Sequence, residues 1–202
     1  MVEHLLAGAV LPVPEPWRRL LAEVRSGLGD PLGSLVPPHV TVLPATRIRP
    51  AELPGLVRHA RAVAATRGPI TIALDGNGIT VFPDTDVVYA PLAEGAEDCA
   101  ALAAALGAGP VRPEAAHPYT AHLTLAQHQG MEALARARAV LGGFSARFAL
   151  PHLVVATSTG SLAEWSTAAR IAFPAARSGR AAEAEPVEGT FQSQEPTEAR
   201  AA

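Results

Sequence analysis

Two short apolar runs in this chain repeat one pattern, and that repeat constrains the fold more than any other feature. The runs PPHVTVLP and YTAHLTLA each contain His-x-Thr with an apolar residue in the middle. Runs of this kind predict buried or half-buried strands. Residues i and i+2 of a strand point to the same face, so His39 and Thr41 would project together, as would His122 and Thr124. We therefore expect a site built from two similar halves, although two histidines that only satisfy hydrogen bonds in a sheet would give the same pattern.

The rest of the chain alternates between strand and helix patterns. Pro and Gly punctuate these patterns, and Asp75-Gly76-Asn77-Gly78 is a turn signal typical of a hairpin between two strands. The expected helices cover 15–28, 51–66, 95–107 and 131–141. The expected strands cover 4–12, 38–46, 69–75, 79–82, 86–92, 119–127, 145–157 and 163–173. This order predicts an α+β fold of two lobes, each with a small antiparallel sheet.

The motifs resemble those of the two-histidine (2H) phosphoesterase superfamily, within it the 2′-5′ RNA ligase-like branch. That family shows Pro-His-x-Thr in its first half and aromatic-x-Pro-His-x-Thr-hydrophobic-small in its second. Residues 38–41 match the first pattern, and 119–126 match most of the second. Ala121 replaces the usual Pro, and Gln127 stands where many members carry a basic residue, which puts a secondary phosphate contact in doubt. The resemblance covers residues 4–173, because the order of elements also agrees.

The resemblance implies a pseudo-twofold fold, in which two small antiparallel sheets flank a central groove with helices outside. It also implies hydrolysis of 2′,3′-cyclic phosphate ends of RNA, to a 2′-phosphate, and the reverse 2′-5′ ligation. His39 and His122 would be catalytic, and Thr41 and Thr124 would bind the phosphate. The resemblance suggests that His122 activates water while His39 protonates the leaving oxygen. An imidazole titrates near pH 6.5, so such a pair can supply one base and one acid.

Four further residues are candidate substrate contacts. Arg47 and Arg49 follow the first motif and could reach phosphates, or could be solvated at a loop end. Tyr119 faces away from the site on a regular strand but could stack on a base from a twisted strand end. Phe82 could be a base platform at the edge of the groove, or part of the core. His117 and His128 flank the second motif and are weaker candidates.

Composition excludes several classes of protein. The net charge is −3, so no general basic surface indicates nucleic acid, and small substrates are slightly favoured over long RNA. The single cysteine, Cys99, excludes an internal disulfide framework and a cysteine-rich zinc site and is expected to pack in a helix. Neither motif carries a second metal ligand at i+2, so we expect no metal and no cofactor. No run is long enough to span a membrane, and the N-terminus does not resemble a signal peptide, so we expect a cytoplasmic monomer.

The C-terminal segment has a different composition. Residues 175–202 are small, polar and acidic with one aromatic residue, which predicts a disordered tail after a catalytic domain at 1–174. Two alternatives to RNA-end hydrolysis stay open. One is a phosphodiesterase for a small nucleotide such as an ADP-ribose cyclic phosphate. The other is a catalytically silent module that binds nucleotides or RNA ends, against which the retention of both complete motifs argues.

Overall fold

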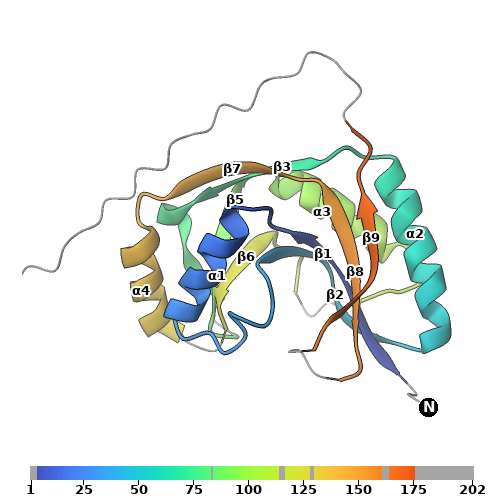
Figure 1. The fold of residues 1–202 in the computed structure, drawn as a ribbon, viewed down its shortest axis with the longest axis horizontal. Helices are drawn as coiled ribbons and strands as arrows, with labels where there is room; N and C mark the ends of the chain where they lie inside the picture. The colour runs from blue at the N-terminus through green and yellow to red at the C-terminus, as the bar shows by residue number, and fades with distance from the viewer. Residues whose placement is uncertain (1–3, 83, 114–116, 128–129, 161–163, 176–202) are drawn as a thin grey trace, which may run out of the picture.

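Nine strands and four α-helices make up the described part of the chain (Figure 1). The structure is a computed structural model, and it describes residues 4–82, 84–113, 117–127, 130–160 and 164–175. The helices are α1 (Trp17–Gly27), α2 (Leu53–Ala65), α3 (Ala96–Gly107) and α4 (Gly130–Leu141), and two 3₁₀ turns are η1 (Pro50–Glu52) and η2 (Gly76–Gly78). The strands are β1 (Leu5–Pro12), β2 (His39–Ile48), β3 (Ile70–Asp75), β4 (Thr80–Phe82), β5 (Val87–Glu94), β6 (His122–Ala126), β7 (Ser145–Leu150), β8 (His152–Ser158) and β9 (Ser166–Ala172).

All strands pair antiparallel in one curled sheet of order β7-β3-β5-β6-β2-β1-β8-β9, with β4 added beside β5. The α+β prediction is therefore confirmed. The two motif strands, β2 and β6, are neighbours at the centre of this order, where Val40 pairs with Leu123. Each is the first of four strands on its own side. The two expected sheets are thus joined through the motif strands.

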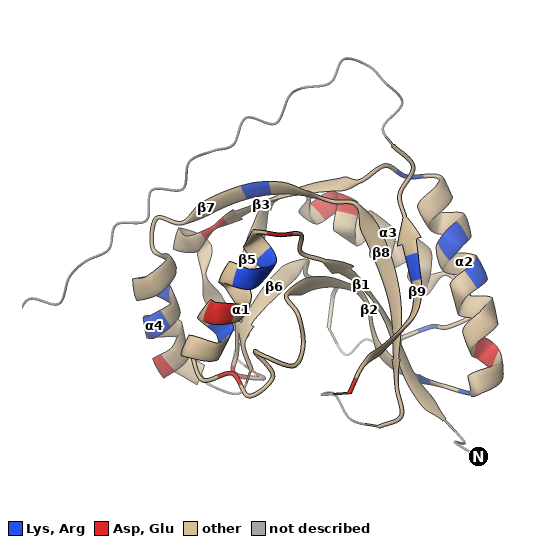
Figure 2. Ribbon diagram, in the orientation of Figure 1, with Lys and Arg blue, Asp and Glu red and all other residues tan. Residues whose placement is uncertain are grey.

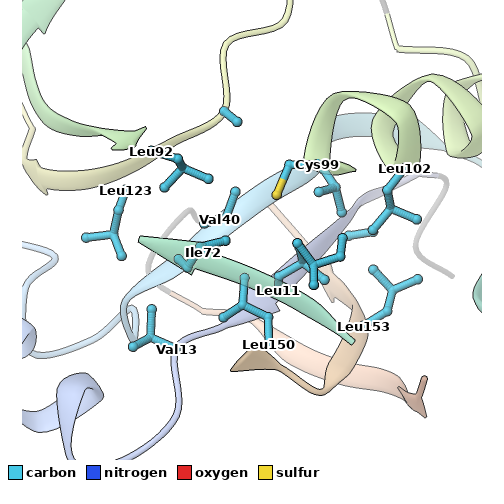
Figure 3. Packing of buried hydrophobic residues seen from close by; sticks show 14 of the residues in the cluster. Leu11, Val13, Val40, Ile72, Leu92, Cys99, Leu102, Leu123, Leu150 and Leu153 are labelled. Atoms are coloured by element: carbon cyan, nitrogen blue, oxygen red, sulfur yellow. The ribbon is translucent and has the colours of Figure 1, made fainter. Parts of the chain in front are cut away.

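The core lies on the sheet face opposite the motif side chains. Val40 and Leu123 are fully buried and pack with residues such as Ile72, Leu92 and Cys99 (Figure 3). Helix α3 contacts β2, and α2 contacts β8 and β9, so these helices cover the apolar face (Figure 1). Burial raises the pKa of the Cys99 thiol to about 12, which confirms Cys99 as a packing residue.

Two sequence predictions about strands were wrong. Strands β3 and β4 do not form a hairpin, because β3 lies between β5 and β7 while β4 pairs with β5. The intervening Gly76 instead packs against the end of α4: a Cβ there would lie 1.7 Å from the Leu141 carbonyl oxygen. The expected single strand 145–157 is two strands, β7 and β8, separated by Pro151, which has no N–H to donate to a ladder.

No helix in the described ranges is long and apolar enough to cross a membrane. The assignment of residues 1–174 to one catalytic domain stays a prediction. The predicted tail at 175–202 lies outside the described residues apart from Ala175.

Candidate functional site

The two motifs meet in one cavity. Its volume is about 330 Å³, within the range of small-molecule sites. Its lining residues are Arg25, Val36, His39, Thr41, Phe82, Val87, His122, Thr124 and Gln127. The sequence-predicted pairs His39/Thr41 and His122/Thr124 are thus brought together, and all four side chains are half-buried.

Strand register explains why the four side chains converge. In the antiparallel pair of β2 and β6, Val40 lies opposite Leu123. Continuing that register places His39 across from Thr124, and Thr41 across from His122. Residues that flank a core-facing pair point to the other face of the sheet, here into the cavity. Each imidazole therefore has one threonine on its own strand and one on the neighbouring strand.

Both imidazoles are held by the same local contact. The Nδ1–H of His39 donates to the Pro37 carbonyl at 2.7 Å, and the Nδ1–H of His122 donates to the Thr120 carbonyl at 2.7 Å. A carbonyl can only accept, so each contact fixes the tautomer with the proton on Nδ1. The Nε2 of each histidine is then the nitrogen available to exchange a proton.

The surroundings of the two histidines differ. Burial lowers the pKa of His39, and the positive charges of Arg25 and His122 lower it further, against the opposing effect of the hydrogen bond to Pro37. Burial also lowers the pKa of His122, against the opposing effect of the hydrogen bond to Thr120. Both imidazoles are therefore biased toward the neutral form.

Aromatic rings hold the imidazole of His122. Phe82 contacts it edge to face with ring centroids 5.0 Å apart, and Tyr89 does so at 5.3 Å. Phe82 also stacks on Tyr89 at 3.9 Å. The predicted residue Phe82 thus lines the cavity, but one face of its ring is already covered by Tyr89. Tyr89 lies on β5 opposite Thr124, a placement that depends on strand pairing and has no local sequence signal.

Arg25 is a cavity residue that sequence reasoning missed. It comes from α1 and is buried, with its Nε and Nη2 donating to Asp30 at 3.0 and 2.7 Å. Its Nη1 donates to the Val36 carbonyl at 2.7 Å. Val36 precedes the Pro37 carbonyl that holds His39, so Arg25 fixes the segment leading into β2 and adds a positive charge to the cavity. Only its position at the end of an amphipathic helix, just before the Gly29-Asp30 break, could have suggested this.

The remaining predicted residues lie elsewhere. Tyr119 precedes β6, is about 39% exposed, and its hydroxyl donates to the Thr41 carbonyl at 2.8 Å, tying the approach to β6 onto β2. Arg47 and Arg49 line a second hollow and are absent from the lining of the histidine cavity. His117 is exposed and is also absent from that lining, and His128 lies outside the described residues.

The polar groups that line the cavity suit an anion better than a metal ion. Among the residues that the structure describes, no group of three or more His, Cys, Asp or Glu could hold a metal ion. The cavity presents two imidazoles, two hydroxyls, the Gln127 amide and the Arg25 guanidinium. Such a set can donate to an anion and exchange protons, which suits chemistry on a phosphate ester.

Comparisons with known proteins agree with this arrangement. Residues 12–161 match the sequence model of the 2′-5′ RNA ligase superfamily. The structure of E. coli LigT in apo form is similar, with a TM-score of 0.61 and 17% identity over 85% of this chain and 98% of LigT. The protein TT0787 of Thermus thermophilus is similar with a TM-score of 0.60 and 18% identity, over 84% of this chain and 98% of that protein. These identities establish the shared fold, and no curated protein matches the sequence.

Proposed function

This chain belongs to the 2′-5′ RNA ligase superfamily, and we propose that it is a metal-independent phosphodiesterase for the 2′,3′-cyclic phosphate ends of RNA. One observation carries the proposal. Two histidines line one cavity, and each has its Nδ1 held by the backbone and its Nε2 left for proton transfer. A proton donor and a proton acceptor on the two sides of a bound phosphate are what in-line opening of a cyclic ester needs.

In the proposed reaction, water attacks the phosphorus atom while the bond from phosphorus to O3′ breaks. One histidine takes a proton from the water through Nε2, and the other gives its Nε2 proton to O3′. The product is a 2′-phosphate beside a free 3′-hydroxyl. Replacing water by the 5′-hydroxyl of a second RNA end gives a 2′-5′ bond by the same proton transfers, so the reverse reaction is ligation.

The neighbouring groups are suited to stabilise the transition state. The hydroxyls of Thr41 and Thr124 can donate to the non-bridging phosphate oxygens, whose charge grows during attack. Arg25 adds positive charge to the cavity, although its donors are used by Asp30 and Val36. A phosphate anion beside the imidazoles would raise the pKa of both, which favours protonation of the histidine that acts as acid.

A bridging-sulfur substrate tests the division of roles. A thiolate leaves without protonation, so a cyclic phosphate with sulfur in place of O3′ should restore turnover only to the variant that lacks the acid. The family resemblance assigns that role to His39, so His39→Ala should be rescued and His122→Ala should not. Rescue of both variants, or of neither, would contradict an acid–base pair.

One observation favours a smaller substrate as the second candidate. The cavity volume of about 330 Å³ suits a single nucleotide, and LigT has been solved with NADP⁺ and with 3′-AMP. A phosphodiesterase for a small nucleotide, such as an ADP-ribose cyclic phosphate, would use the same four residues. The chemistry would be unchanged, and only the group attached beyond the cyclic phosphate would differ.

Product analysis by ³¹P NMR tests the proposed function. RNA oligonucleotides and mononucleotides ending in a 2′,3′-cyclic phosphate should both give a terminal 2′-phosphate, and a His39→Ala/His122→Ala double variant serves as the control. A 3′-phosphate product would contradict the proposed leaving oxygen. Binding of either substrate without any turnover would instead assign the chain to the non-catalytic class.

A further inference from the structure

A second hollow lies at the end of β2 away from the histidines. Its volume is about 700 Å³, and we call it the arginine hollow after Arg47, Arg49 and Arg112, which line it with His4 and Glu52. The first two arginines belong to the end of β2 and the residue after it. Arg112 comes from the segment between α3 and β6.

The charges in the arginine hollow are only partly compensated. Arg49 pairs with Glu52, with Nη2 3.2 Å from Oε1, and this arginine is the main reason that the pKa of the Glu52 carboxyl is lowered. No carboxylate in the described ranges forms an ion pair with Arg47 or Arg112, whereas Arg18, Arg25, Arg136 and Arg147 are all paired. On a chain of net charge −3, this is a local concentration of exposed positive charge.

Strand pairing places Arg47 on the same sheet face as the catalytic motif. Thr41 pairs with Val10 of β1, and Arg47 pairs with Leu6 of the same strand. Val10 and Leu6 are four residues apart, so their side chains share a face, and paired residues share a face too. The irregularities in this ladder add residues to β2 and leave that relation intact. Arg47 therefore stands about 14 Å along the strand from Thr41.

We propose that the arginine hollow binds the phosphodiester backbone of an RNA strand whose cyclic end occupies the histidine cavity. This inference rests on the proposed function. A strand rises about 3.4 Å per phosphate when stacked, so about four nucleotides separate the two sites. Arg47 and Arg112 would contact phosphates at that distance, and Arg49 would contribute once a phosphate competes with Glu52 for it. The hollow would read strand length and would be indifferent to base sequence.

A length series tests the proposal directly. The quantity measured is the ratio of kcat/KM for a cyclic-phosphate hexanucleotide to that for the cyclic mononucleotide, with a dinucleotide as an intermediate length. We expect the hexanucleotide to exceed the mononucleotide by at least about fivefold at low salt, with no gain for the dinucleotide. In Arg47→Ala/Arg112→Ala the ratio should fall to near one. Each lost phosphate contact should also reduce the salt slope of hexanucleotide binding by about 0.7.

Arg61→Ala is the matched control. Arg61 is an exposed arginine on α2, whose basic positions lie on its outer side (Figure 2) and whose apolar side packs on the core. Removing it changes the net charge as each hollow substitution does, so it should leave the length ratio unchanged. A wild-type ratio near one, or a ratio that survives in Arg47→Ala/Arg112→Ala, would overturn the proposal.

Two further outcomes separate neighbouring explanations. Inorganic pyrophosphate should lower kcat/KM for the hexanucleotide more than for the mononucleotide, because it shares the phosphate chemistry. If pyrophosphate binds through Arg47 and Arg112 while the length series is flat, the ligand is a free phosphate compound and the RNA proposal is overturned. If no cyclic phosphate is hydrolysed, the proposed function fails, and fluorescence anisotropy of the same hexanucleotide with the same variants still tests the hollow alone.

Discussion

Val40 of β2 lies directly opposite Leu123 of β6, and this single pair relates the two halves of the candidate site. An antiparallel pair has a local twofold axis perpendicular to the sheet. That axis exchanges His39 with His122 and Thr41 with Thr124. The two backbone-held imidazoles are thus equivalent by geometry and differ in what surrounds them: Arg25 adds charge near His39, and Phe82 and Tyr89 enclose His122.

The threonine hydroxyls should contribute less than the histidines, and comparably to each other. Thr41→Val or Thr124→Val keeps the side-chain shape but removes one donor to the phosphate, which should lower kcat/KM for a cyclic mononucleotide by about 10- to 100-fold. Thr→Ser at either position keeps the hydroxyl and is the control, expected to retain most activity. Equal losses for Val and Ser would show that the methyl group matters and that the hydroxyl does not.

The pH dependence of kcat/KM should have its maximum below the ordinary histidine pKa of about 6.5. Burial lowers the pKa of both imidazoles, with Arg25 adding to the effect at His39. The base must be neutral, so the rate falls as pH drops below the lower apparent pKa. The acid must be protonated, so the rate falls as pH rises above the higher one.

The profile of kcat should lie at higher pH than that of kcat/KM, because bound phosphate raises the pKa of both imidazoles. Initial rates across pH at low and saturating substrate measure both profiles. A kcat/KM maximum above about pH 7.5 would contradict the lowered pKa values.

Breaking the buried pair of Arg25 and Asp30 should destabilise the fold. Asp30→Ala leaves the Arg25 guanidinium buried without its carboxylate partner, which should lower the free energy of unfolding by about 3–5 kcal/mol. Urea unfolding measures this. Glu15→Ala, which removes the exposed partner of Arg18, is the control and should change little. A loss under about 1 kcal/mol for Asp30→Ala would mean that the pair does not hold the segment before β2.

Turnover should survive treatment with EDTA. Only the two histidines among the cavity-lining residues are common metal ligands, and neither has a carboxylate or thiolate beside it in that lining. Hydrolysis of a cyclic mononucleotide with and without the chelator checks this expectation. Inhibition that Mn²⁺ or Zn²⁺ reverses would place the site among metal-dependent phosphoesterases.

The candidate site could be predicted because its signals are local. The two-residue period of a strand places His39 with Thr41 and Val40 away from them, and the same holds for His122, Thr124 and Leu123. That alternation needs no knowledge of the partner strand. The family resemblance then supplied the expectation that both strands face one cavity, which the lining residues bear out.

What could not be predicted depends on contacts between distant segments. Arg25 reaches the cavity because of how α1 packs, and its pairing with Asp30 has no motif of its own. The Asp75–Gly78 turn has the composition of a hairpin turn, but packing of Gly76 against Leu141 and the pairing of β3 with β7 override it. Arg47 follows the motif in sequence, yet the length of β2 carries it to a separate hollow.

The most direct test of the account is the rate of cyclic-phosphate hydrolysis by variants of the two histidines. His39→Ala and His122→Ala should each lower kcat/KM for a 2′,3′-cyclic mononucleotide by about 10²–10⁴-fold, because each removes one proton carrier. The double variant should be little worse than either single variant, since acid and base act as a unit. Near wild-type turnover by either single variant, in protein that folds normally by circular dichroism, would contradict the proposed mechanism.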